Sequence, residues 1–186
     1  MNTSKNSADP SQLITSRLNL RPVITSNTDD LFRIYGDPDT SKFNPAGPYP
    51  DIDYTRDVLA HWLKHWEEHN FGNWSISLKD KPERIIGFGG LTIRTYADIP
   101  INNLGYRFSS ESWGKGMATE FARYAISYGF NQLKMPEISA YTDPRRMGQK
   151  DKVRDRVNSF YRNISSAPPP SRHFAGNCPL LTRRSC

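Results

Sequence analysis

The chain has 186 residues, of which 24% are charged and 36% hydrophobic, so a single globular domain is the default expectation. No stretch approaches the roughly 18 consecutive apolar residues of a membrane-spanning helix, and the polar N-terminal residues lack the apolar segment of a signal peptide. These absences argue against membrane partners and predict a soluble, cytoplasmic protein. Two cysteines, Cys178 and Cys186, are weak grounds for a disulfide.

The formal net charge of +6 is unevenly distributed along the chain. Residues 143–186 hold ten Lys and Arg against three acids, a net charge of +7, whereas residues 1–142 have a net charge of −1. A basic segment attracts phosphate nonspecifically, so nucleic-acid binding through this tail is one hypothesis. The tail has few of the aromatic residues that stack on bases, which makes nucleic acid the least favoured partner.

The first predicted elements are a strand and a helix that follow a polar segment. Residues 1–15 are predicted to be flexible. Leu18 and Leu20 alternate with polar residues, as in a half-buried strand. Thr28 is predicted to cap the first helix, and Gly36 can end it.

A second helix is predicted after the proline-rich loop Lys42–Pro50, with Asp53 as its cap. Its apolar residues recur at helical spacing: Leu59, Trp62, Leu63 and Trp66. Three histidines recur in the same way and could align as metal ligands: His61, His65 and His69. No acid or cysteine completes a ligand set, so a solvated face is favoured for them and no metal site is predicted.

Two strands are predicted next. Trp74, Ile76 and Leu78 alternate with polar residues, which indicates one buried face. In the following strand the apolar residues run Ile86, Phe88 and then Leu91, Ile93. This one-residue change of phase predicts a β-bulge at Gly89–Gly90.

The last predicted elements form a strand–helix–strand unit. The strand Leu104–Phe108 leads into a helix over about Lys115–Leu133, and the strand Glu137–Thr142 follows. Such a unit favours parallel pairing of its two strands. The predicted fold class is therefore α/β (α+β), with a mixed central β-sheet flanked by helices.

The segment Trp113–Gly116 is the most informative part of the sequence. A glycine loop that leads into a helix presents free backbone N–H groups and the positive end of the helix dipole, which together bind phosphate or pyrophosphate. The pattern is neither a Walker A loop nor a dinucleotide fingerprint, because no third glycine follows Gly116. The alternative interpretation is a strand–helix junction that needs small residues for close packing.

From about Ser16 to Thr142 the chain resembles the GNAT-superfamily N-acetyltransferases, and within them the ribosomal-protein-alanine acetyltransferase branch. The resemblance rests on an opening strand and on an ordered series of motifs: Ser16–Pro22, Gly105-Tyr106, Trp113–Gly116 and Ala118–Glu120. It implies a GNAT-like sheet, acetyl-CoA as co-substrate and no metal. It also implies an amine acceptor, either a protein N-terminus or a small amine. Homodimer formation is left open.

The resemblance also assigns a site for acetyl-CoA. Loop amides are expected to hold the pyrophosphate, a backbone N–H near Phe108 is expected to stabilise the oxyanion, and Glu120 is expected to be a structural hydrogen-bond partner. The expected coenzyme-binding residues are Tyr106, Arg107, Phe108, Trp113, Gly114, Lys115, Gly116, Met117, Ala118 and Thr119.

The chain departs from the family pattern at its predicted catalytic positions. Relatives often carry a carboxylate just before Gly-Tyr, where this chain has Asn102 and Asn103. Glu111 stands where the loop motif usually has Gln or Arg. As the nearest acid it is the candidate catalytic residue, and loop surface is its other interpretation. A catalytically impaired copy that retains at most acetyl-CoA binding is the alternative to an active enzyme.

After Thr142 the family pattern, the charge balance and the periodicity change together. The Asn–Ser pair, the Gly-Phe motif and the further strands of the family are not found. We therefore predict three segments: 1–15, the acetyltransferase-like domain 16–142, and a basic, disordered tail 143–186. A reading-frame change in the coding DNA would produce such a boundary, and a natural basic extension is the alternative. In either case the C-terminal part of the fold is predicted to be missing or replaced.

Overall fold

The computed structural model describes residues 13–42, 44, 46–96, 98–140 and 180–183. Its strands are β1 (Leu13–Ile14), β2 (Leu18–Pro22), β3 (Asn73–Leu78), β4 (Lys81–Tyr96), β5 (Ile99–Phe108), β6 (Glu137–Ala140) and β7 (Leu180–Arg183). Its α-helices are α1 (Thr28–Tyr35), α2 (Pro38–Ser41), α3 (Ile52–His69) and α4 (Met117–Asn131). Two 3₁₀ turns are η1 (Thr25–Asn27) and η2 (Ser110–Ser112).

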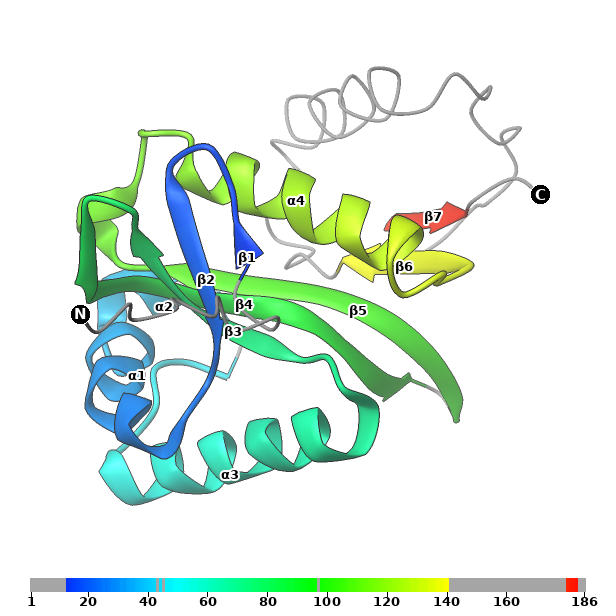
Figure 1. The fold of residues 1–186 in the computed structure, drawn as a ribbon. Helices are drawn as coiled ribbons and strands as arrows, with labels where there is room; N and C mark the ends of the chain where they lie inside the picture. Colours follow the sequence, from blue (N-terminus) through cyan, green and yellow to red (C-terminus); the bar gives the residue numbers. More distant parts are fainter. Residues whose placement is uncertain (1–12, 43, 45, 97, 141–179, 184–186) are drawn as a thin grey trace, which may run out of the picture.

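The seven strands form one sheet in the order β1-β2-β3-β4-β5-β6-β7. Neighbouring strands run antiparallel except β5 and β6, which are parallel and are connected through α4. This is the strand–helix–strand unit predicted from the sequence. α4 covers one face of the sheet, and α1 and α3 cover the other (Figure 1). The arrangement confirms the predicted fold class, a mixed sheet flanked by helices.

Apolar side chains fill both interfaces between the sheet and its helices. Under α4, the Phe121 and Trp74 rings lie 6.2 Å apart between centroids, and both side chains are fully buried. On the other face, Phe88 packs in one buried cluster with Leu31 and Leu59. Burying each such side chain stabilises the fold by about 1.5–3 kcal/mol. These contacts fix α4 against the sheet and so fix where its N-terminus lies.

The bulge predicted at Gly89–Gly90 is wrong, because these residues pair in continuous register with both neighbouring strands. The irregularity lies earlier in β4, where Ile85 and Gly87 oppose consecutive residues of β3. The apolar residues change phase because both faces of β4 are buried. Phe88 lies in the cluster under α1 and α3, and Leu91 lies in the cluster under α4. A rule that assumes one buried face therefore misplaces the bulge.

Two predicted helix caps are displaced by one or two residues. η1 precedes α1, so Thr28 is already helical and its hydroxyl donates to the Thr25 carbonyl at 2.8 Å. α3 is capped by Asp51, whose carboxylate accepts the Tyr54 amide N–H at 2.7 Å, rather than by Asp53. Both aspartates are of a type that caps helices, so residue type alone does not choose between them.

One histidine of α3 makes tertiary hydrogen bonds. His65 donates from Nδ1 to the Phe71 carbonyl at 2.8 Å, and its Nε2 accepts the Ile93 amide N–H at 3.0 Å. A carbonyl only accepts and an amide N–H only donates, so His65 is the neutral Nδ1–H tautomer. Burial lowers the pKa of His65 below its ordinary value. The predicted solvated face is therefore wrong at this position.

β7 is a strand that the sequence did not predict. Its four residues, within the basic tail, pair antiparallel with β6, and so short a segment shows no diagnostic periodicity. The predictions for residues 1–12, 141–179 and 184–186 lie outside the described residues. In the part of the chain that is described, no helix is long and apolar enough to cross a membrane. The same residues contain no group of three or more His, Cys, Asp or Glu placed to hold a metal ion.

Candidate active site

Two glycines in the left-handed backbone conformation join β5 to α4. Gly114 has a φ of 74° and Gly116 has a φ of 76°, a region that residues with a Cβ rarely adopt. Gly116 is the N-cap of α4, which begins at Met117, two residues later than predicted. A Cβ added at Gly114 would meet no atom within 4 Å, so this side of the loop is open.

The first turn of α4 presents backbone amides that have no partner within the helix. The first i→i−4 hydrogen bond of α4 runs from the Glu120 amide to the Gly116 carbonyl, at 3.0 Å. The amides of Met117, Ala118 and Thr119 precede it, and Gly116 has no side chain with which to cap them. They lie at the positive end of the helix dipole. This arrangement binds phosphate groups at helix N-termini.

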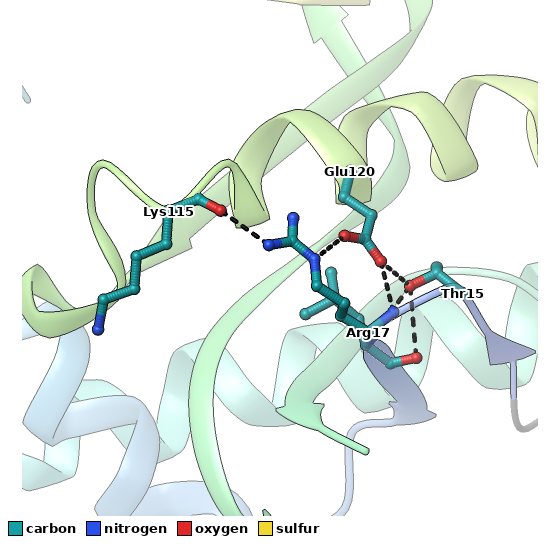
Figure 2. Close-up of polar contacts among 5 residues, drawn as sticks. Thr15, Arg17, Lys115 and Glu120 are labelled. Carbon is teal, nitrogen blue, oxygen red and sulfur yellow. Dashed lines mark hydrogen bonds and ion pairs between the residues drawn. The ribbon is translucent and has the colours of Figure 1, made fainter. Parts of the chain in front are cut away.

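A hydrogen-bond network ties this turn to the chain that enters β2 (Figure 2). The Glu120 carboxylate accepts the Thr15 hydroxyl at 2.6 Å, the Arg17 amide at 2.7 Å and the Arg17 Nε–H at 2.6 Å. Arg17 also donates from Nη1 to the Lys115 carbonyl at 3.0 Å. One arginine therefore holds both the glycine loop and the first turn of α4, and the predicted structural role of Glu120 is confirmed.

The same contacts keep Glu120 ionised. Burial alone would raise the pKa of this carboxyl, but the hydrogen bonds from Thr15 and Arg17 and the guanidinium charge outweigh burial and hold the pKa below its ordinary value. The carboxylate is thus neutralised by Arg17 and does not repel an anion at the loop. Sequence reasoning missed Arg17, which lies 103 residues before Glu120, because no local spacing reports such a contact.

Aromatic side chains lie between β5 and the glycine loop. The rings of Tyr106 and Phe108 face α4, with centroids 5.7 and 6.1 Å from that of Phe121. Trp113 donates its indole N–H to the Phe108 carbonyl at 3.1 Å and so closes the loop on the end of the strand. Tyr106 and Trp113 remain 46% and 50% exposed, which leaves both able to contact a ligand beside the amides.

The edge of β5 that faces β6 pairs with it at one position among the described residues. Its other edge pairs with β4 along its whole length. Among the described residues, Asn103–Ser139 is the one Cα partner pair between β5 and β6, and Asn102 Nδ2 donates to the Glu137 carbonyl at 3.1 Å beside it. From Leu104 to Phe108 no residue has a Cα partner on this edge among the described residues. Its backbone groups can therefore bind an extended chain in the manner of an added strand.

Glu111, the candidate catalytic acid, forms an exposed ion pair. Glu111 Oε2 lies 2.5 Å from Arg84 Nη2 of β4, and both side chains are more than half exposed. Arg84 offsets the negative charge that Glu111 brings to the first position of the loop motif. Asn103, close to where relatives often carry a carboxylate, is buried. Glu111 is thus a candidate proton acceptor only by its place in the sequence, just before the loop.

Arg107 points to the opposite face of β5 from Tyr106 and Phe108. Its guanidinium carbon lies 4.2 Å from the centroid of the Tyr35 ring, and Nη1 donates to the Ser41 hydroxyl at 2.9 Å. The side chain therefore faces α1 and α2, away from the amides of α4. Of the residues expected to bind the coenzyme, Arg107 is the one whose side chain lies on the other face, so its contact is restricted to its backbone.

This sequence matches those of known acetyltransferases. The family model described as Acetyltransferase (GNAT) domain matches residues 17–148. The uncharacterized N-acetyltransferase p20 of Bacillus licheniformis is 30% identical over 132 residues, which cover 71% of this chain and 73% of the relative. The chain therefore belongs to the GNAT family, and it is an acetyltransferase.

Solved structures share the fold. The crystal structure of an acetyltransferase from Agrobacterium tumefaciens superposes with a TM-score of 0.67 at 23% identity, covering 100% of this chain and 99% of that one. The structure of Mycobacterium smegmatis RimJ in complex with CoA-disulfide superposes with a TM-score of 0.58 at 15% identity, covering 74% of this chain and 68% of that one. These likenesses establish the fold.

Proposed function

We propose that this acetyltransferase transfers the acetyl group of acetyl-CoA to a primary amine, either a protein N-terminus or a small amine. The observation that carries the proposal is the first turn of α4, where three amides without helical partners follow two left-handed glycines. A pyrophosphate is a suitable ligand for these amides because it is anionic and accepts several hydrogen bonds. The sequence resemblance to ribosomal-protein-alanine acetyltransferases favours a protein N-terminus as the acceptor.

In this proposal the amides from Gly114 to Ala118 hold the pyrophosphate, and the Lys115 ammonium adds a positive charge. The Trp113 amide was also expected here, but it donates to the Ser110 carbonyl at 3.1 Å. The pantetheine arm lies along the open edge Leu104–Phe108 and bonds to its backbone groups. The exposed faces of Tyr106 and Trp113 flank the arm. The hydrogen bonds from Arg17 to Glu120 and to the Lys115 carbonyl hold the amides in place before the coenzyme binds. This lowers the entropy cost of binding.

The reaction is a direct transfer for which acetyl-CoA supplies the activated thioester. The neutral amine attacks the carbonyl carbon, so that a C–N bond forms and the C–S bond breaks. A backbone N–H of β5 near Phe108 stabilises the oxyanion that develops during attack. The amine proton passes to a base, for which Glu111 acting directly or through water is the candidate, and the leaving thiolate takes up a proton.

An assay with the full-length chain tests this function. The protein is incubated with acetyl-CoA and either an alanine-initiated peptide or a small primary amine, and acetylated product and free CoA thiol are both quantified. Product and thiol are expected in equal amounts. Acetyl-CoA binding without product from any amine would instead indicate the catalytically impaired alternative. Absence of acetyl-CoA binding to the folded protein would contradict the proposal.

A further inference from the structure

A half-buried arginine on the α1 and α3 face of the sheet has no acidic partner in the part of the chain that the structure describes. Arg107 stacks on the Tyr35 ring at 4.2 Å and donates from Nη1 to the Ser41 hydroxyl and the Tyr35 carbonyl, at 2.9 and 3.4 Å. These acceptors are neutral. None of the ion pairs among the described residues includes Arg107. A charge withdrawn from water without a counter-ion is costly, which points to a ligand that supplies one.

The tyrosines beside Arg107 do not supply the missing negative charge. Burial raises the pKa of Tyr35 to about 12 and also raises the pKa of Tyr49, although the charges of Arg107 and Arg94 act to lower both. Both phenols are therefore neutral at physiological pH. The charge of Arg94, on β4, also acts on these two phenols, with a smaller effect than that of Arg107. An anion beside Arg107 would meet a guanidinium group and neutral aromatic rings.

In this inference the acceptor approaches β5 on the face that Arg107 shares with Gly105. α4 occupies the other face of the strand (Figure 1). Gly105 has no side chain, and a Cβ added to it would meet only Asn103 Nδ2 of the described residues within 4 Å, at 3.4 Å. It precedes Arg107 by two residues, or about 7 Å along the strand. An amine that reaches the strand over Gly105 would place a neighbouring substituent within reach of the guanidinium.

We propose that Arg107 selects acceptor amines that also carry a carboxylate near the attacking nitrogen. This inference rests on the proposed function and narrows its acceptor class. A planar guanidinium binds a carboxylate through two parallel hydrogen bonds, and Arg107 has donors beyond the Nη1 group that contacts Ser41 and Tyr35. Cationic acceptors such as polyamines are disfavoured by like charge. The carboxylate comes either from a free amino acid or from an acidic residue near a protein N-terminus.

Binding measured by calorimetry tests the inference without requiring turnover. The full-length protein is saturated with CoA and titrated with two peptides that differ only in having Asp or Asn after an N-terminal alanine. A second pair, alanine and alanine amide, tests the free amino acid. The acidic member of at least one pair is expected to bind about tenfold or more tightly, the scale of one charge-assisted contact. The pair that shows the preference identifies the source of the carboxylate.

Two substitutions link the preference to this side chain. Arg107→Met removes the charge but keeps an apolar stem against Tyr35, and it is expected to abolish the preference. Arg56→Met is the matched control, because it removes an exposed arginine of α3 and changes the net charge equally. Arg107→Lys, which keeps the charge, is expected to retain part of the preference if Arg107→Met misfolds.

Equal binding of the acidic and neutral members of both pairs would overturn the inference, as would a preference that survives in folded Arg107→Met. Acetyl-CoA binding and acetyl transfer to neutral amines would still be observed in that case. The proposed acetyl transfer would then still be supported, and the proposed preference for acceptors that carry a carboxylate would be refuted. If CoA itself does not bind, the proposed function fails first.

Discussion

Gly114→Val is expected to weaken coenzyme binding strongly while the protein remains folded. A Cβ at this position meets no atom within 4 Å, so the cost to stability arises from the left-handed φ of 74° and is about 1–2 kcal/mol. The valine methyl groups would occupy the open side of the loop, where the pyrophosphate is proposed to approach. Loss of two contacts from amides to charged oxygens, at about 1.5–3 kcal/mol each, weakens affinity by about 10²–10⁴-fold.

The chain offers a closely matched control at Gly47. This glycine has a φ of 72°, a Cβ added to it would also meet no atom within 4 Å, and it lies between α2 and α3. Gly47→Val and Gly114→Val should lose similar stability in thermal melts, and calorimetry should find the loss of acetyl-CoA affinity in Gly114→Val alone. Parent-like affinity in folded Gly114→Val, or equal weakening in Gly47→Val, would refute the loop assignment.

Three further changes probe the loop and the sheet that supports it. Lys115→Ala should weaken acetyl-CoA binding by about 1.5–3 kcal/mol, with a smaller salt dependence in calorimetry. Glu120→Gln removes the ion pair with Arg17 and should lower stability by about 1–3 kcal/mol. The lowered pKa of Glu120 means that its stabilisation is complete above the unfolded value of 4.5 and is lost as pH falls, so melts of Glu120→Gln should lack this acid sensitivity. His65 also has a lowered pKa, so stability should decline as pH falls below 6.5, and His65→Gln should flatten this decline. Unchanged pH profiles in the two variants would contradict these assignments.

The glycine loop could be predicted from the sequence because its chemistry is local. Gly114 and Gly116 are needed where φ is positive, and a helix start follows them directly, so the amides of the first turn are identified by position along the chain. The order of the longer strands and helices could be predicted for the same reason, since alternation and helical spacing are properties of short windows. The short elements β1, α2 and β7 were not predicted.

Features that depend on contacts between distant segments could not be predicted. The ion pair between Arg17 and Glu120 joins residues 103 positions apart. His65 accepts the Ile93 amide N–H only because α3 lies against β4. Neither pair leaves a pattern in a short window. The misplaced bulge has a related cause, because strand alternation does not reveal that helices cover both faces of β4. The face on which Arg107 lies follows from alternation, but the absence of an acidic partner for it among the described residues does not.

Amide hydrogen exchange at residues 114–119 is the most direct test of the claim that this turn holds the pyrophosphate of acetyl-CoA. The free amides of the loop and of the first turn of α4 should exchange more slowly when acetyl-CoA is saturating. Acetyl-pantetheine, which lacks the pyrophosphate, should not slow them. Unchanged exchange at residues 114–119 in protein saturated with acetyl-CoA would contradict the claim.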